Sequence, residues 1–162
     1  MKAIIMADAI GKLLCDSKST LAVAESCTGG MLAAMLTEVP GASEYFLGGV
    51  IAYSNEVKQR LLGVPRELIT AHGAVSEEIA RAMSEGCRES FGSDYALSIT
   101  GIAGPTAPDS SKPVGLVYIA LGSADATEVH EHRMGGTRAA IRKRSAMQAM
   151  DYLRLKLISR AP

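Results

Sequence analysis

The sequence predicts a single α/β domain in which helices flank a mixed β-sheet, forming a three-layer sandwich. Short apolar runs of strand length alternate with segments whose apolar residues recur at helical spacing. Glycine-rich turns follow two of the expected strands, at residues 25–30 and 100–105. Two strand-like runs near the C-terminus flank one short turn, which predicts a hairpin. Strands interleaved with helices and followed by one hairpin indicate a mixed sheet covered by helices.

The N-terminal segments alternate between helix and strand. Residues 4–14 place apolar side chains at helical spacing, and residues 21–24 form the short, wholly apolar run expected of a buried strand. Residues 31–37 are rich in Ala, Leu and Met and predict a helix, which ends at Val39-Pro40-Gly41. Residues 46–53 then predict a second strand.

The middle of the chain predicts two helices and a third strand. Residues 55–62 have helical character and stop at Gly63-Val64-Pro65. Residues 76–91 predict a longer helix, which Ser76 begins as a capping residue. Residues 95–100 predict a strand that enters the second glycine-rich turn.

The C-terminal third predicts the hairpin and a closing helix. Residues 105–113 are rich in Pro, Ser and Asp and are expected to form a loop. Residues 114–121 and 129–134 predict two strands, and residues 137–158 predict a long helix. A length of 162 residues suits one domain and no linker is evident, so we expect residues 1–162 to form a single domain.

Charge and cysteine content exclude several classes of function. Seventeen basic residues balance seventeen acidic ones, so we expect no nucleic-acid partner and no binding to an anionic membrane. No apolar run approaches the ~20 residues of a membrane span. The spacing of Cys15, Cys27 and Cys87 matches no zinc or redox motif, so we expect free thiols, a cytoplasmic location and neither a metal nor a cofactor. The sequence leaves the oligomeric state open, a homo-oligomer included.

The turn after the first expected strand is the first candidate for a ligand site. Ser26 and Thr28 supply hydroxyl groups, and Gly29 and Gly30 permit close approach to the backbone. Free N–H groups at the start of the following helix favour an anion or a polar ligand. An ordinary turn with a hydroxyl helix cap is the alternative interpretation.

Two further turns belong to the same expected site. Ligands in α/β sheets bind outside the carboxyl ends of the strands, which predicts that residues 25–30, 53–58 and 100–105 lie together. Thr100 and Gly101 open the last of these turns, where the backbone could cradle a ligand. A tight turn that merely requires glycine is the alternative.

Lys58 is a candidate general base, and Tyr53 ends the strand before it. With Asn55 as the expected helix cap, Lys58 falls in the first helical turn, where the helix dipole disfavours its charged form. Burial would lower its pKa in the same direction. A lysine base must lose its proton near neutral pH, well below the usual pKa of about 10.4. A solvated surface lysine is the alternative.

Arg138 and Arg142 begin the last expected helix, four residues apart and on one face. Two guanidinium groups near a helix start can hold a phosphate, although an exposed basic helix would carry the same residues. Ser43 follows a turn and precedes an apolar strand, and composition alone gives it no special role.

Five segments carry distinctive motifs, and their order gives the sequence a family resemblance. They are Ala-Glu-Ser-Cys-Thr-Gly-Gly at 24–30, Tyr-Ser-Asn-Glu-x-Lys at 53–58, His-Gly-Ala-Val-Ser at 72–76, Thr-Gly-Ile-Ala-Gly-Pro at 100–105 and Lys-Pro-Val-Gly at 112–115. Together they resemble the CinA C-terminal domain family, whose stand-alone members include nicotinamide-nucleotide amidases. The resemblance runs from about residue 4 to residue 158.

The resemblance implies a metal-free serine–lysine amidohydrolase that converts nicotinamide mononucleotide to nicotinate mononucleotide and ammonia. It implies Ser43 as the nucleophile, Lys58 as the general base and Tyr53 as an assisting residue. Arg142 would face the substrate phosphate, with Arg138 as a helper. The residues expected to line the substrate site are Ser26, Thr28, Gly29, Gly30, Thr100 and Gly101.

Several alternatives stay open at this point. Ser26 lies in the stronger motif and is the other candidate nucleophile. A non-catalytic nucleotide-binding module and a hydrolase of another amide are the competing functions. Two departures from the family pattern are the loop 106–111, where relatives are richer in glycine, and Thr137, where many relatives have Asp. Thr and Asp both cap helices, so only the loop puts the fit of the substrate in question.

Overall fold

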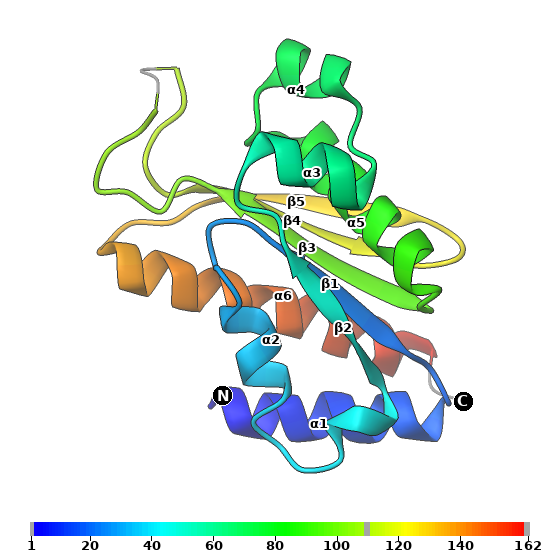
Figure 1. The fold of residues 1–162 in the computed structure, drawn as a ribbon. Coiled ribbons are helices and arrows are strands. Elements are labelled where there is room, and N and C mark those ends of the chain that lie inside the picture. Colours follow the sequence, from blue (N-terminus) through cyan, green and yellow to red (C-terminus); the bar gives the residue numbers. More distant parts are fainter. Residues whose placement is uncertain (1, 109–110, 161–162) are drawn as a thin grey trace.

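The computed structural model describes residues 2–108 and 111–160, and it confirms the predicted α/β class. A five-stranded sheet in the order β2-β1-β3-β4-β5 separates two layers of helices (Figure 1). The first three strands are parallel, and the last two form the predicted antiparallel hairpin. The strands are β1 (Leu21–Glu25), β2 (Phe46–Ile51), β3 (Tyr95–Gly101), β4 (Leu116–Gly122) and β5 (Thr127–Arg133).

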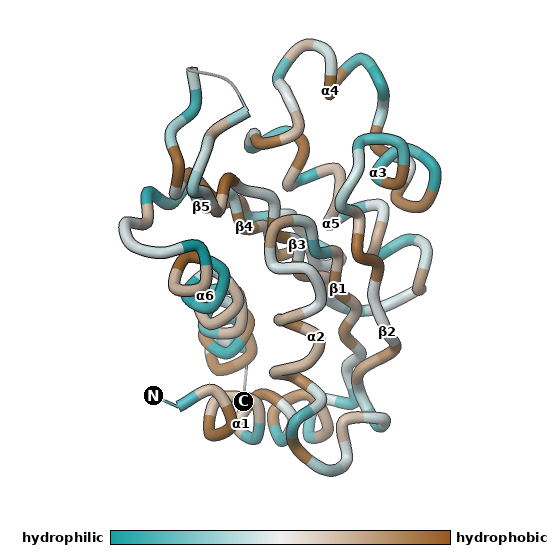
Figure 2. Tube along the Cα trace, turned by 60° about the vertical axis from the view of Figure 1, so that its left-hand side comes forward, coloured by the Kyte–Doolittle hydropathy of each residue, from teal (hydrophilic) through white to brown (hydrophobic). Residues whose placement is uncertain are grey.

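Three helices lie on each side of the sheet in the described part of the chain. One layer contains α1 (Ala3–Asp16), α2 (Met31–Leu36) and α6 (Arg138–Arg160), and the other contains α3 (Asn55–Leu62), α4 (Arg66–His72) and α5 (Glu77–Phe91) (Figure 1). In Figure 2, hydrophilic and hydrophobic residues alternate along α3 and α6, as expected of helices that bury one face. A short 3-10 helix, Ala42–Glu44, precedes β2.

The two faces of β1 belong to different hydrophobic cores. Leu21 and Val23 point into the core beneath α1, α2 and α6, whereas Ala22 and Ala24 point into the core beneath α5. This division follows from the alternation of side chains along a strand. The small side chains let the second helical layer lie close to the sheet. A β-carbon at Gly86 of α5 would lie 1.8 Å from the carbonyl oxygen of Leu62, so α3 and α5 touch at the backbone.

Parallel register brings three turns to one edge of the sheet. Glu25, the last residue of β1, pairs with Ile51 of β2 and with Ile99 of β3. The residues that follow these positions therefore leave the sheet side by side, at its carboxyl edge. This arrangement confirms the expectation that the turns at residues 25–30, 53–58 and 100–105 lie together.

The structure also corrects some local predictions. The segment Arg66–His72 forms helix α4, which was not expected from the sequence. Strand β2 ends at Ile51, two residues earlier than expected. Ser54, not Asn55, caps α3, because its side chain accepts a hydrogen bond from the N–H of Val57. No helix in the described residues is long and apolar enough to cross a membrane.

Candidate active site

A pocket of about 250 Å³ opens at the carboxyl edge of the parallel strands. The residues that line it include Ser26, Tyr53, Lys58, Thr100, Gly101 and Arg138. A larger depression of about 710 Å³ lies around Ser93 and the β4–β5 turn, at the opposite end of the sheet. We assign the site to the smaller pocket, because it alone holds the buried lysine and lies where α/β sheets bind their ligands.

Lys58 is almost fully buried, with only 1% of its surface exposed, which is rare for a lysine. The backbone brings it inside because Ser54 caps α3 and so places Lys58 in the first turn of that helix, facing the sheet. Burial lowers the pKa of its ammonium group below the usual range and outweighs the opposing influence of the neighbouring Cys27 thiol. Lys58 therefore has the environment that the base hypothesis requires.

Three oxygens surround the Lys58 amine. Its Nζ lies 2.9 Å from the carbonyl oxygen of Ala52, 3.4 Å from that of Tyr53 and 3.2 Å from Ser26 Oγ. A neutral amine has two N–H donors and one lone pair, and the two carbonyl oxygens can only accept. Once both N–H groups point at the carbonyls, the lone pair faces the Ser26 hydroxyl. Protonated Lys58 donates to Ser26 Oγ across this 3.2 Å contact, and a neutral amine in the same place can accept from the Ser26 hydroxyl instead.

Ser26 is the first residue of the turn that follows β1. Its N–H donates to the carbonyl of Ile99, which ties the turn to β3 at 3.0 Å, and its own carbonyl accepts from the N–H of Gly29 at 3.1 Å. The side chain is 8% exposed and lines the pocket. These contacts fix the Ser26 hydroxyl between the Lys58 amine and the space open to a ligand.

The predicted pair of Ser43 and Lys58 is contradicted by the geometry. Ser43 is exposed on the short helix before β2, at the amino end of that strand, whereas Lys58 follows its carboxyl end. The six residues of β2 separate the two by roughly 20 Å, at about 3.3 Å per residue. The structure brings Ser26 to Lys58 instead, as the alternative interpretation of the sequence allowed.

Tyr53 and Arg138 meet across the mouth of the pocket. Arg138 donates through Nη2 to the Tyr53 hydroxyl at 2.9 Å and through Nη1 to the carbonyl of Gly104 at 2.7 Å. Tyr53 is 59% exposed, and only its backbone carbonyl touches the Lys58 amine. Thr137 caps α6 as predicted, through a hydrogen bond from the N–H of Ala140, and so places Arg138 at the first position of the helix.

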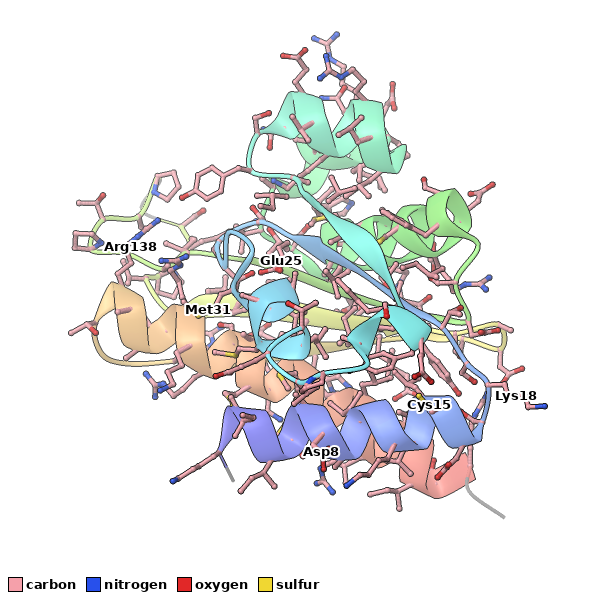
Figure 3. All side chains as sticks on the ribbon, turned by 60° about the horizontal axis from the view of Figure 1, so that its bottom comes forward. Asp8, Cys15, Lys18, Glu25, Met31 and Arg138 are labelled. Atoms are coloured by element: carbon pink, nitrogen blue, oxygen red, sulfur yellow. The ribbon has the colours of Figure 1, made fainter. Side chains whose placement is uncertain are left out.

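The start of α2 does not offer the free N–H groups that the sequence suggested. Glu25 fills this position with its own carboxylate, which accepts from the N–H groups of Gly30 at 3.1 Å, Leu32 at 3.0 Å and Ala33 at 2.9 Å. Figure 3 shows Glu25 beside the first turn of α2. This role of Glu25 was not predicted, although an acid that ends an apolar strand just before a helix start is a recognisable signal.

Arg142 and the later residues of the turn do not line the pocket. Arg142 donates through Nε to the carbonyl of Cys27 at 3.1 Å and through Nη2 to that of Thr28 at 2.8 Å. Among the described residues, the buried hydroxyl of Thr28 has no hydrogen-bond partner. Gly29 and Gly30 both have positive φ, at 58° and 93°, and shape the turn rather than the pocket wall.

Thr100 and Gly101 do line the pocket, on the side of β3. The Thr100 hydroxyl donates to the carbonyl of Ala74 at 2.7 Å. Lys112 donates to the carbonyl of Val75 at 2.7 Å, so two side chains hold the segment that forms the opposite wall. A β-carbon at Gly101 would lie 2.7 Å from a Val117 methyl group, which requires glycine there. Composition and spacing did not indicate the roles of Ala74, Val75 and Lys112.

The described residues contain no group of three His, Cys, Asp or Glu side chains that could hold a metal ion. His130 stacks on Tyr152 with 4.0 Å between ring centroids. His132 Nε2 lies 2.8 Å from the Tyr152 hydroxyl, and burial lowers the pKa of this imidazole. The two histidines are therefore engaged with an aromatic ring, outside the pocket.

Comparisons with known proteins agree with this architecture. The model of the CinA C-terminal domain family matches residues 4–157. A CinA-like protein of Citrifermentans bemidjiense is 52% identical over 96% of this chain, and one of Endomicrobium trichonymphae is 49% identical over 96%. The chain spans only 37% and 36% of the lengths of these two relatives.

Solved structures show the same fold. A CinA superfamily protein from Klebsiella pneumoniae superposes with a TM-score of 0.95 at 31% identity, covering 98% of this chain and 99% of that one. The competence/damage inducible protein CihA from Agrobacterium tumefaciens gives 0.92 at 35% identity, covering 97% and 96%.

Proposed function

Because the chain belongs to the CinA C-terminal domain family, we propose that it is a serine amidohydrolase that hydrolyses the carboxamide of nicotinamide mononucleotide, releasing ammonia and nicotinate mononucleotide. One observation supports a catalytic role above all others. The buried amine of Lys58 lies 3.2 Å from Ser26 Oγ and has no ion-pair partner among the described residues. A lysine held in this way is suited to act as a base, whereas a module that only binds nucleotides has no use for it.

The proposed reaction begins when neutral Lys58 takes the proton of Ser26 as Oγ attacks the carboxamide carbon. The amide nitrogen leaves as ammonia after receiving that proton from the Lys58 ammonium. The resulting ester on Ser26 is then hydrolysed by water, which Lys58 activates in the same way. Both half-reactions use one base and return Lys58 to its neutral form.

The tetrahedral intermediate needs hydrogen-bond donors for its oxyanion. The N–H groups of Gly30, Leu32 and Ala33 already bind Glu25, so they do not supply these donors. By position, we propose the N–H groups of Cys27 and Thr28, which directly follow the nucleophile; the first of them matches the donor that strand-to-helix serine hydrolases use, the N–H of the residue after the nucleophile.

The proposed substrate fits the size and polarity of the pocket. A volume of about 250 Å³ accommodates a pyridine carboxamide and part of its ribose. The amide would lie deep, next to Ser26 and Lys58, and the phosphate would lie at the mouth. Arg138 is the cation that lines this mouth, so it is our candidate for phosphate recognition.

The test is ammonia release by purified protein incubated with nicotinamide mononucleotide, with the product identified by chromatography. Parallel incubations with free nicotinamide and with the dinucleotide test for another amide substrate, and we expect free nicotinamide to be the poorest of the three. Thermal stabilisation by the mononucleotide without turnover, in well-folded protein, would instead identify a binding module. A Lys58→Met variant provides the inactive control.

A further inference from the structure

We propose that Glu25 and Arg142 are positioning residues that hold the Ser26 turn from opposite sides, and that Arg142 does not bind the substrate phosphate. The positioning role in catalysis rests on the proposed function. The clamp itself is a statement about the turn and can be tested without turnover. It also replaces the role that family resemblance implied for Arg142.

Glu25 holds the N–H side of the turn. Its carboxylate is 1% exposed, and three backbone N–H groups at the start of α2 supply its hydrogen bonds. A buried carboxylate is unfavourable unless its oxygens are satisfied. Here the satisfaction comes from the chain that follows Ser26. Movement of that chain would leave a charge buried without partners, so Glu25 resists any change of the turn.

Arg142 holds the carbonyl side of the same turn. Its Nε and Nη2 donate to the carbonyl oxygens of Cys27 and Thr28, the two residues after Ser26. The side chain comes from the second turn of α6, a 23-residue helix packed against the sheet and against α1. A planar guanidinium can reach two adjacent carbonyls at once, which a lysine cannot do with the same geometry. Arg142 thus ties the turn to a rigid element from the other end of the chain.

The two contacts complement each other in charge. The carboxylate binds N–H groups and the guanidinium binds C=O groups, and neither forms a side-chain ion pair within the described part of the chain. The backbone between them is therefore held at both of its polar sides. Ser26 lies at the start of this segment, with its N–H bound to Ile99. Displacement of a reacting group by about 1 Å can slow a reaction about 10²-fold, so the clamp matters for catalysis.

Position argues against a phosphate-binding role for Arg142. The pocket is lined by Arg138, and Arg142 is not among its lining residues. A β-carbon at Gly29 would lie 3.4 Å from Arg142 Nη2, so the guanidinium packs directly against the turn. A phosphate on Arg142 would have to compete with two carbonyl oxygens that are already bound.

Cys27 provides a measurement of the turn that is independent of activity. Its carbonyl accepts from Arg142, its thiol is 6% exposed, and burial raises the pKa of that thiol to about 11. Alkylation of Cys27 should therefore be slow in the native protein and faster when the turn opens. Cys15 is exposed, so the measurement is made in a Cys15→Ser background, with mass mapping to distinguish Cys27 from the buried Cys87.

We compare Arg142→Lys and Arg142→Ala with Lys143→Ala as the matched control. Lys143 is the next residue of α6, exposed and of the same charge. We expect the Arg142 variants to alkylate Cys27 at least about tenfold faster and to lose about 10²-fold in kcat with little change in KM. Glu25→Gln should show the same pattern more weakly, because it keeps one carbonyl oxygen as an acceptor. Lys143→Ala should match the parent.

Two results would overturn the proposal. Arg142→Ala with native Cys27 reactivity would show that the guanidinium does not hold the turn. A raised KM for the mononucleotide with unchanged kcat would show that it binds the phosphate. If the parent protein has no amidase activity, the proposed function fails, yet the Cys27 rates still decide whether the clamp exists. If Arg142→Ala does not fold, Arg142→Lys and Glu25→Gln give the same comparison.

Discussion

Two turns of this molecule look alike in sequence but differ in what surrounds them. The turn after β1 and the turn before β2 each carry a serine beside glycine with positive φ, Ser26 with Gly29 and Ser43 with Gly41. Ser26 is buried against Lys58, whereas Ser43 is exposed and distant from it. The difference arises because one turn leaves the carboxyl end of a parallel strand and the other enters the amino end. A serine in a glycine-containing turn becomes a candidate nucleophile only at the first kind of position.

Replacing each serine with alanine should give the largest difference in activity between the two turns. We expect Ser26→Ala to lower kcat for the mononucleotide about 10³-fold or more, since the nucleophile is lost, and Ser43→Ala to remain within about twofold of the parent. Steady-state ammonia release measures both. The Ser43→Ala variant is also the folding control, because its side chain is exposed. The reverse pattern of activities would restore the original assignment of Ser43.

The second prediction tests whether Lys58, which lies at the carboxyl edge of the sheet beside Ser26, acts as a neutral base. Lys58→Arg should lower kcat about 10²-fold or more, because a guanidinium stays protonated and cannot act as a base. In the parent, kcat/KM should rise with pH and level off below the usual lysine range, since burial lowers the pKa of Lys58. A pH–rate profile checks this. A plateau reached only above about pH 10.4 would contradict the role of a depressed lysine.

The same depressed pKa predicts the pH dependence of stability. Between the lowered folded-state pKa of Lys58 and its unfolded value, the unfolded chain binds more protons, so the free energy of unfolding should rise with pH across that window. Lys58→Met should remove this rise and should be more stable than the parent at neutral pH, because it no longer buries an amine. Urea unfolding at several pH values measures both effects. A Lys58→Met variant less stable than the parent would show that the buried amine stabilises the fold.

An Arg138→Ala variant tests whether this residue, at the mouth of the pocket, recognises the substrate phosphate. We expect Arg138→Ala to raise KM for the mononucleotide about tenfold, and to leave KM for a substrate without phosphate nearly unchanged. The hydroxyl of Tyr53 also loses its donor in this variant. Tyr53→Phe therefore serves as the companion variant that removes the same contact and keeps the cation. Equal effects of Arg138→Ala on both substrates would argue against phosphate recognition.

The smallest expected effect compares the glycines of the two turns. Gly29 and Gly41 have φ of 58° and 86°, so alanine at either position should cost about 1 kcal/mol or more in the free energy of unfolding. Only Gly29→Ala should also lower kcat, because relief of its strained φ would shift the turn whose carbonyls Arg142 holds, whereas Gly41 belongs to the turn of the exposed and distant Ser43. Denaturant unfolding and steady-state kinetics on both variants separate the two effects.

Much of the fold follows from local pattern in the sequence. The strands have apolar runs of the right length, and glycines or prolines mark the ends of most elements. Helix α4 was missed because its seven residues, Arg66–His72, bury no side chain fully and carry only two adjacent aliphatic residues, Leu68 and Ile69, which is too short a pattern to show helical spacing. Strand register and strand order could not be predicted in this way, because they depend on contacts between segments far apart in the chain.

The site was predictable only where topology and motif agree. The rule that ligands lie at the carboxyl ends of strands correctly placed Ser26, Lys58 and Thr100 in one pocket. The same rule does not point to Ser43, which was chosen from the family resemblance alone. The clamp was not predictable, because the Arg142 contacts join residues 114 and 115 positions apart. Glu25 was overlooked because the anion expected at the helix start proved to be part of the chain itself.

The most direct test of the central claim is to identify the serine that a fluorophosphonate modifies during inactivation. The account predicts one adduct per chain on Ser26, forming in proportion to the loss of ammonia release and at least about 10²-fold more slowly in Lys58→Met. Complete inactivation with Ser26 unmodified, or with the adduct on Ser43, would contradict it.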